Sequence, residues 1–393
     1  MYSSVSPSLS LPEPPAELAS LSERLCRNIV AEIERSGPMS FDRYMQMALY
    51  EPGLGYYVNG LHKFGSAGDF VTAPEQGGLF AAALARQCDE VAGQLGRNWT
   101  LMELGAGSGV LARDLLESLS RLPREYLILE PSAPLREVQH ETLSRLPTEL
   151  FERVRWIDQP PGEPFDGIIV GNEVIDALPV ARFEIGEHDE LLEQCVEFDG
   201  KRFVWASGPP RPRLQEAVSG LRQRLSRPLP DGFASEVCID LPGWVETVTE
   251  ALSSGLVLFI DYGYPREEYY LPDRGEGTLV CHYRHRAHFD PFVWPGLTDI
   301  SAFVDFTAVA EAGTRIGLEV AGFTSQAGFL LGLGAHEAVE AASNDRQRLK
   351  LAGELKRLTL PGEMGEKFKV IGLSRGLDSP LSGFGLMSQL HRL

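Results

Sequence analysis

The chain of 393 residues is long enough for two domains or for one domain with a large insertion. Its 43% hydrophobic and 23% charged residues are typical of a globular protein and exclude a disordered one. The formal net charge of −19 argues against nucleic acid or an anionic membrane as a partner, and it is compatible with a basic partner such as a protein segment that carries an arginine.

The cysteines and the start of the chain indicate the compartment. The five cysteines are scattered and odd in number, with no CxxC pair, which is typical of a reducing environment rather than of a disulfide framework. No apolar run approaches the roughly 20 residues of a membrane-spanning helix. The first basic residue is Arg24, so the sequence predicts neither a secretory signal nor an arginine-rich transit peptide. We therefore expect a cytoplasmic protein with no membrane insertion.

Residues 1–98 predict a disordered N-terminus followed by a helical cap that serves as a cofactor lid. Residues 1–15 are rich in Ser and Pro and are expected to be disordered. The spacing of Leu and Ile predicts a helix over Leu18–Arg35, and Ser40 is the expected N-cap of a helix over Phe41–Leu49. After a loop rich in Gly and Tyr, a third helix is predicted over Leu79–Val91.

The most informative stretch is a strand, a glycine turn and a helix. Trp99–Leu104 is an apolar run broken by a single acid, Glu103, and it is followed by Gly105-Ala106-Gly107-Ser108-Gly109. Leu111, Leu115, Leu119 and Leu122 then recur at helical spacing. Glycines let the backbone approach a ligand closely, and the N-terminus of the helix behind them offers unpaired N–H groups.

Two nucleotide-binding motifs fail at Val110. A G-x-G-x-x-G fingerprint needs Gly or Ala there, and a P-loop needs Gly-Lys at 110–111, so an oxidoreductase that uses NAD is the weakest alternative. Glu103 would repel a pyrophosphate but suits an ammonium or a sulfonium, as in S-adenosylmethionine. Glu130 follows the strand Tyr126–Leu129, where a carboxylate can accept both ribose hydroxyls. The alternative is an ordinary βαβ unit whose glycine turn serves packing.

The remaining pattern predicts an α/β, Rossmann-like class I methyltransferase fold. It has a seven-stranded, mostly parallel sheet, with five parallel strands closed by a hairpin-like last pair. We expect the core to comprise residues 99–180 and 251–393, with an N-terminal helical extension and a β-rich insertion at 181–250 that forms a substrate or dimer surface. The further predicted elements are a helix at Leu135–Leu146, strands at Val154–Ile157, Phe165–Val170, Arg182–Ile185, Leu191–Phe198, Arg202–Trp205 and Leu256–Ile260, a helix at Ile300–Ala312, and strands at Leu318–Phe323 and Lys369–Leu373.

Four stretches together resemble one family. They are GDFVTAPEQG (68–77), ELGAGSG (103–109), GNEVIDALPVARFE (171–184) and IDYGYPREEYY…GTLVCHYRHRAHFDPFVWPGLTDISAFVDF (260–306). They resemble the methyltransferase family of the mitochondrial complex I assembly factor, MidA in a slime mould, and its bacterial counterparts. One departure is that many relatives carry Pro and Arg at the positions of Ala106 and Ser108.

The resemblance implies a class I fold, S-adenosyl-L-methionine as methyl donor and S-adenosyl-L-homocysteine as product. From the mitochondrial members it also implies protein-arginine N-methylation of a respiratory complex I subunit. Since no transit peptide is predicted, we expect a bacterial member whose protein substrate carries an exposed arginine and can differ from a complex I subunit. A methyltransferase for a small molecule, and a non-catalytic assembly factor that retains the cofactor pocket, remain as alternatives, and a homodimer is left open.

Glu173 and Asp176 are the candidate catalytic residues. They follow the fourth core strand, three residues apart, and resemble in placement the acidic pair of arginine methyltransferases. A guanidinium is a poor nucleophile because it is always protonated in water, so a pocket must hold it by carboxylates that also accept its proton. The hypothesis is that Glu173 pairs with the guanidinium and that Asp176 assists. The alternative is that Asp176 caps a short helix and Glu173 is solvated.

The candidate cofactor residues come from five loops. Asp69 would hold the ammonium of the methionine end and Thr72 its carboxylate, unless the two form only a capping turn. Asp158 would accept the adenine amino group, and Asn172 would offer its side-chain carbonyl to the cofactor or the nucleophile. The complete set is Asp69, Thr72, Glu103, Gly105, Ala106, Gly107, Gly109, Glu130, Asp158 and Asn172.

A zinc site is considered and not predicted. His282, His285 and His288 stand near Cys281, but their spacing does not converge as in a HExxH helix, and no second Cys pair completes a tetrahedral set. We expect these histidines to belong to a polar pocket wall instead.

Overall fold

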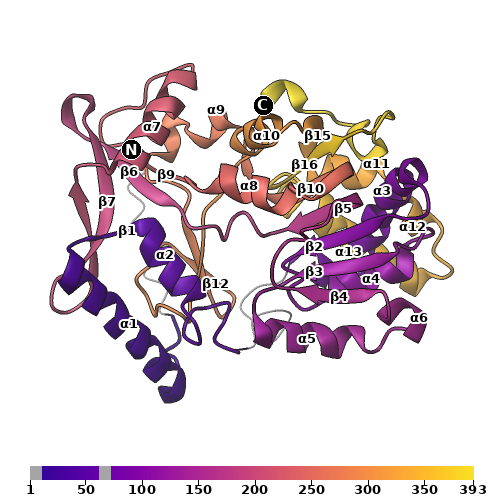
Figure 1. Cartoon of the computed structure of the whole chain (residues 1–393), viewed down its shortest axis with the longest axis horizontal. Coiled ribbons are helices and arrows are strands. Elements are labelled where there is room, and N and C mark those ends of the chain that lie inside the picture. Colours follow the sequence, from indigo (N-terminus) through magenta and orange to yellow (C-terminus); the bar gives the residue numbers. More distant parts are fainter. Residues whose placement is uncertain (1–10, 62–71) are drawn as a thin grey trace.

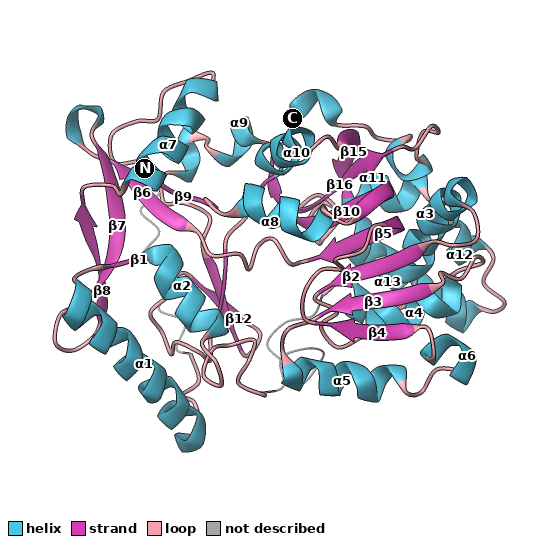
Figure 2. Ribbon diagram, viewed as in Figure 1, coloured by secondary structure: helices cyan, strands magenta, loops and turns pink. Residues whose placement is uncertain are grey.

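Two lobes make up the part of the chain that the computed structural model describes, residues 11–61 and 72–393 (Figure 1). The larger lobe contains an eight-stranded sheet in the order β15-β16-β10-β5-β2-β3-β4, with β14 paired to the end of β10 (Figure 2). The strands of this sheet are β2 (Thr100–Leu104), β3 (Glu125–Leu129), β4 (Val154–Ile157), β5 (Phe165–Asn172), β10 (Leu252–Tyr264), β14 (Val304–Asp305), β15 (Glu319–Ser325) and β16 (Phe368–Arg375).

The predicted strand directions are confirmed. Strands β4, β3, β2, β5 and β10 run parallel, and β16 is antiparallel to both β10 and β15. The seven-stranded sheet of the class I methyltransferase fold is therefore present, with the two-residue β14 as an addition. The last two strands are not joined by a tight turn, because the helices α11, α12 and α13 lie between them in the chain.

Side chains along the central strands point alternately to the two faces of the sheet, and helices cover both faces. Leu101 and Ile168 are fully buried on one face, where α3, α4, α11 and α13 contribute apolar side chains. Met102 and Ile169, the next residue of each strand, are fully buried on the other face, which α8 and α10 cover. Strands buried in this way need apolar residues at every position, as the sequence pattern indicates.

Most of the helices connect the strands of this sheet, and others, such as α1 and α2, belong to the smaller lobe. They are α1 (Ala16–Ser36), α2 (Phe41–Tyr50), α3 (Leu79–Leu95), α4 (Val110–Ser118), α5 (Ala133–Leu143), α6 (Thr148–Phe151), α7 (Pro212–Arg224), α8 (Leu241–Thr249), α9 (Arg266–Tyr269), α10 (Phe306–Arg315), α11 (Gln326–Gly332), α12 (Glu337–Glu340) and α13 (Asp345–Thr359). Among them, no helix is both long and apolar enough to cross a membrane.

The smaller lobe, at the left of Figure 1, combines distant parts of the chain. One sheet has the order β1-β7-β6-β9, with β8 paired to β7, and a second has the order β12-β11-β13. Their strands are β1 (Met39–Ser40), β6 (Ala181–Ile185), β7 (Leu191–Phe198), β8 (Phe203–Gly208), β9 (Ala234–Val237), β11 (Val280–Tyr283), β12 (Arg286–His288) and β13 (Asp299–Ser301). One apolar core joins α1 and α2 to residues of β7, β8, β11 and β13.

One local prediction is wrong, and another is confirmed only in the position of the residue. The helix expected at Ile300–Ala312 begins only at Phe306, because residues 299–301 and 304–305 pair as strands and the Asp305 carboxylate caps α10 by accepting the N–H of Ala308 at 3.1 Å. Ser40 precedes α2 as expected, but its hydroxyl donates to Asp42 and caps no backbone N–H. The predicted disorder of residues 1–15 lies mainly outside the described residues.

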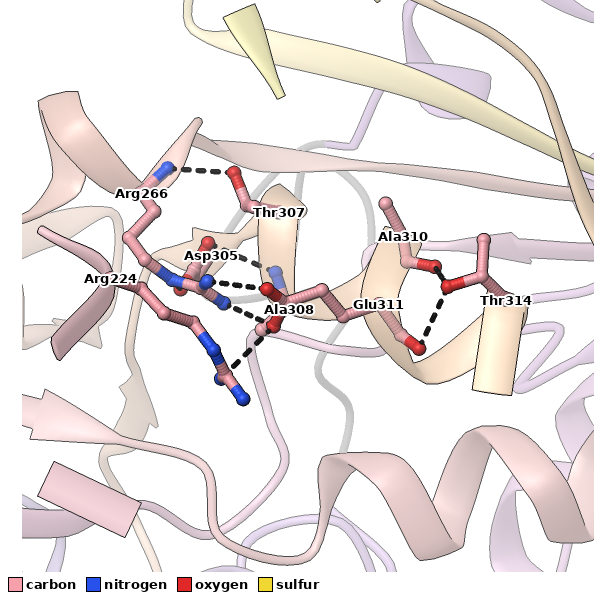
Figure 3. Close-up of polar contacts among 8 residues, drawn as sticks. All are labelled: Arg224, Arg266, Asp305, Thr307, Ala308, Ala310, Glu311 and Thr314. Atoms are coloured by element: carbon pink, nitrogen blue, oxygen red, sulfur yellow. Dashed lines mark hydrogen bonds and ion pairs between the residues drawn. The ribbon is translucent and has the colours of Figure 1, made fainter. Parts of the chain in front are cut away.

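A buried arginine fixes the start of α10 (Figure 3). Arg266 is 7% exposed, and its guanidinium donates to Asp305 at 3.1 Å and to both carboxylate oxygens of Glu311 at 2.7 Å. Its backbone N–H donates to the hydroxyl of Thr307. Arg224 of α7 reaches the same Glu311 at 3.4 Å, so the insertion is tied to the core at this point.

We expect Arg266→Ala to destabilise the protein by about 3 kcal/mol, because it leaves the buried Asp305 without its cation. Arg224→Ala, in the same network but with a side chain that is 59% exposed, should cost less than about 1 kcal/mol. Urea denaturation of both variants checks the prediction, and equal losses would contradict it.

Candidate active site

A cavity of about 880 Å³ opens at the carboxyl ends of the parallel strands, where α/β folds bind their ligands. The loops after β2, β3, β4 and β5 and Tyr262 of β10 line it from the larger lobe, and side chains of α2, β11 and β13 line it from the smaller one. The fold therefore gathers in one place residues that are far apart in the sequence.

The glycine turn forms one wall of this cavity. Gly105, Gly107 and Gly109 have φ angles of +62°, +53° and +80°, in the left-handed region that favours glycine. A Cβ at Gly105 would lie 3.3 Å from the Val174 side chain. Gly105, Ala106 and Gly107 line the cavity, whereas Gly109 lies behind them, packed against α5.

The two carboxylates predicted to face the cofactor are both buried in the cavity wall. Glu103 accepts the Tyr126 hydroxyl at 2.7 Å, and burial raises its pKa to about 7 although that hydrogen bond lowers it. Glu130 accepts the Ser132 N–H and the Gln139 amide, each at 3.0 Å, and burial raises its pKa as well.

The other predicted cofactor residues are arranged around the same space. Thr72 and the exposed Asp158 line the cavity, and so does Asn172, whose side-chain oxygen is buried without a hydrogen-bond partner among the described residues. Asp69 lies outside the described residues. An open glycine turn, two buried carboxylates and a buried, unpaired carbonyl oxygen fit S-adenosylmethionine, which combines cationic groups with a ribose diol.

Glu173 reaches the cavity from a strained turn. Its φ of +54° is left-handed, and its backbone N–H donates to the carbonyl of Ile260 at 2.8 Å. The carboxylate accepts the Asn172 amide at 3.2 Å and the Ala73 N–H at 3.4 Å. Burial, and then the charge of Asp176, raise the pKa of Glu173 to about 8.

Asp176 and Asp261 lie beside it. Asp176 is 6% exposed and accepts the Tyr262 hydroxyl, and burial followed by the charge of Asp299 raises its pKa to about 6. Asp176 therefore faces a tyrosine and caps no helix. Asp261 accepts the N–H groups of Ile175 at 3.0 Å and Asp176 at 3.3 Å, which holds the loop of the two candidate catalytic residues against the end of β10.

The smaller lobe completes the acidic end of the cavity. The Tyr57 hydroxyl donates to Asp299 at 3.0 Å, and the Tyr50 hydroxyl donates to the carbonyl of Ala177 at 2.9 Å. The rings of Tyr50 and Tyr57 stack with centroids 5.6 Å apart. His282 lines the cavity opposite Asp299 in the pairing of β11 with β13, as expected for a polar wall. The same expectation is wrong for His285 and His288, which lie in the turn after β11 and on β12 and do not line the cavity.

The sequence analysis did not identify several of these residues. Asp261 ends an apolar strand just as Glu130 follows one, so the same signal would have found it. Asp299, Tyr50, Tyr57 and Tyr262 carry no such signal, because packing between the lobes or around β10 decides what they face.

In the described part of the chain, no group of three or more His, Cys, Asp or Glu side chains is arranged to hold a metal ion.

Acids dominate the charge of the cavity. Among the described residues that line it, eight are carboxylates, Lys367 is the single lysine, and none is an arginine. The eight are Glu75, Glu103, Glu130, Asp158, Glu173, Asp176, Asp299 and Glu363. A cavity of this composition attracts a cationic ligand.

Comparisons with known proteins identify the family and the cofactor. Residues 83–324 match a family model described as "Putative S-adenosyl-L-methionine-dependent methyltransferase". The chain is 42% identical to a Burkholderia thailandensis protein, described as a "likely methyl transferase" and bound to S-adenosyl-homocysteine, with a TM-score of 0.91 and coverage of 98% of this chain and 100% of that one. The chain belongs to this family of S-adenosylmethionine-dependent methyltransferases, and S-adenosylmethionine is its cofactor.

Two curated relatives carry a more specific name. The protein arginine methyltransferase NDUFAF7 homologue, mitochondrial, of Drosophila melanogaster is 29% identical over 93% of this chain and 90% of its own length. Protein arginine methyltransferase NDUFAF7, mitochondrial, of Danio rerio is 28% identical over 89% of this chain and 87% of its own length.

We predict that affinity for S-adenosylmethionine rises as Glu103 ionises. Burial raises the pKa of Glu103 to about 7, so below this pH the carboxyl is mostly protonated. It must then lose its proton before it can attract a cation. The dissociation constant should fall about tenfold between pH 6 and pH 8, and Glu103→Gln should remove most of this dependence. Isothermal titration calorimetry at several pH values measures both, and an unchanged slope in the variant would refute the role of Glu103.

Proposed function

We propose that the protein methylates arginine side chains of a protein substrate. The observation that carries this proposal is the acidic end of the cavity, where Glu173, Asp176 and Asp299 stand beyond the glycine turn. Among the described residues, no lysine or arginine forms an ion pair with Glu173 or Asp176. A cation from outside the chain would supply the missing partner.

A guanidinium fits this arrangement better than an ammonium does. It is planar, it is always charged, and its donors form a fork that matches a pair of carboxylate oxygens. Glu173 and Asp176, three residues apart on one loop, offer such oxygens, and the stacked rings of Tyr50 and Tyr57 supply flat walls nearby. The raised pKa of each carboxyl means that binding of a cation would also draw it into its ionised form.

The residues of this chain have two tasks in the reaction. When bound, S-adenosylmethionine supplies a methyl group on a sulfonium. A guanidinium nitrogen forms the new carbon–nitrogen bond as the carbon–sulfur bond breaks, and the proton on that nitrogen passes to a carboxylate. Glu173 would take this proton, since its high pKa makes it a good acceptor near neutral pH. Asp176, held by the Tyr262 hydroxyl, would orient the substrate.

Two further facts support a protein substrate. The names of the Drosophila and zebrafish relatives specify protein arginine methylation. The net charge of −19 favours the approach of a basic segment. A subunit of respiratory complex I is the first substrate to test, because the resemblance of the sequence motifs implies it.

Transfer of labelled methyl groups from S-adenosylmethionine to protein fractions tests the proposal, with amino acid analysis of the product. We expect label on arginine in protein. Label on lysine, or turnover only on small molecules, would refute it.

We expect Glu173→Gln to lower kcat/KM for the protein substrate by at least about a hundredfold, because it removes both the charge that holds the guanidinium and the proton acceptor. The dissociation constant for S-adenosylmethionine should change little. Glu363→Gln is the matched control, since Glu363 lines the same cavity but is exposed. A variant of Glu173 with normal turnover would show that another group does this work.

The same substitution should stabilise the protein without ligand at alkaline pH. The pKa of Glu173 is raised in the folded state, so its contribution to stability is present at low pH and is lost as pH rises towards about 8. Glu173→Gln avoids this loss, and we expect a gain on the order of 2 kcal/mol at pH 8.5 after allowing for partial exposure to cavity water, with little gain at pH 5. Thermal unfolding at both pH values checks the sign; a larger gain at pH 5 would contradict it.

A further inference from the structure

A buried amide links the glycine turn to the Glu130 carboxylate. Gln139 of α5 is fully buried, and its side-chain nitrogen donates to the Glu130 carboxylate at 3.0 Å and to the Gly107 carbonyl at 3.1 Å. Its side-chain oxygen accepts the indole N–H of Trp156 at 3.0 Å. One side chain thus contacts the carboxylate after β3, the glycine turn after β2 and a residue of β4.

The partners allow only one orientation of this amide. An indole N–H can only donate, so the amide oxygen must face Trp156. The Glu130 carboxylate and the Gly107 carbonyl can only accept, so the NH₂ group must face them. If the amide were flipped, its NH₂ group would face the indole N–H and its oxygen would face the two acceptors, so all three hydrogen bonds would be lost. A buried network in which every member is satisfied is rigid, which makes Gln139 suited to holding other groups in place.

The backbone of α5 at Gln139 also packs closely against Gly109 of the glycine turn. A Cβ added at Gly109 would lie 3.2 Å from the Gln139 Cα and 3.4 Å from its carbonyl oxygen. The close approach of α5 to the glycine turn therefore needs glycine at this position. It brings the Gln139 side chain within reach of both Gly107 and Glu130.

We propose that Gln139 is a positioning residue for the methyl donor: it holds the Glu130 carboxylate and the Gly107 peptide in the arrangement that receives the cofactor, and Trp156 holds Gln139. The side chain itself is fully buried and lies behind the residues that line the cavity. The proposal rests on the predicted role of Glu130 at the cofactor, and not on arginine as the methylated residue.

Two substitutions test this role by calorimetry with S-adenosylmethionine. Gln139→Met keeps the volume but removes all three hydrogen bonds, and we expect affinity to fall about tenfold at every pH. Gln139→Glu places a second carboxyl against Glu130. At pH 8 both would be ionised and repel, so affinity should fall by about a hundredfold.

The pH dependence separates positioning from loss of structure. At pH 6 the introduced carboxyl in Gln139→Glu can hold a proton and donate it to Glu130, so the ratio of its dissociation constant to that of the wild type should shrink. Leu143→Ala is the matched control, because Leu143 lies one turn further along α5 and is also fully buried. It should lower the melting temperature and leave the affinity and its pH dependence unchanged.

Each outcome has a distinct meaning. If Glu130→Gln weakens binding but both Gln139 variants bind normally, the proposed role of Gln139 is wrong. If Glu130→Gln itself has no effect, the assignment of Glu130 to the cofactor fails first. Should Gln139→Glu not fold, Gln139→Met and Trp156→Phe carry the test, and normal affinity in both would overturn the proposal. Trp156→Phe removes the donor to Gln139 and keeps an aromatic ring, although a smaller one, at this position.

Discussion

Burial of carboxylates at one edge of the sheet is the constraint on which the site depends. Glu103, Glu130, Asp176 and Asp261 are each less than 10% exposed, although an ionised carboxyl is costly to remove from water. Tyrosine hydroxyls, backbone N–H groups and one amide donate hydrogen bonds to them in place of bound cations, although Asp176 Oδ1 is buried without such a partner among the described residues. Such partners lower the cost but supply no positive charge, so a cation from outside can still bind to these carboxyls.

The topology explains why these acids meet. Five parallel strands place their carboxyl ends side by side, and an acid at or after the end of each of several strands then faces the same space. The smaller lobe closes this space from the other side with Tyr57 and Asp299, which come from segments far apart in the chain. The glycine turn, Glu103 and Glu130 therefore lie on the side of the larger lobe, and the acidic end of the cavity lies between the two lobes.

Sequence reasoning located cavity residues that stand at a strand end and missed those whose position depends on packing. Glu103, Glu130 and Glu173 could be found because each stands next to a glycine turn or a strand terminus in the chain. Asp299 could not, since its short strand pairs within the smaller lobe and its apolar neighbours imitate the spacing of a helix. Gln139 stands at helical spacing between Leu135 and Leu143, on the buried face of α5, but its polar partners come from other elements and leave no signal in the sequence.

The conformation of Glu173 connects the stability of the fold with the role proposed for this residue. A left-handed backbone costs a residue with a Cβ on the order of 1 kcal/mol, and the burial of its carboxyl adds to that cost. Both would be relieved by an exposed, right-handed turn, yet the N–H bond to Ile260 and the contacts with Asn172 and Ala73 hold the residue in place. A protein that keeps a destabilised carboxyl so well fixed spends folding stability on preorganisation. Under the proposed function, the benefit would come when a cation enters, because the same carboxyl could then ionise without having to move.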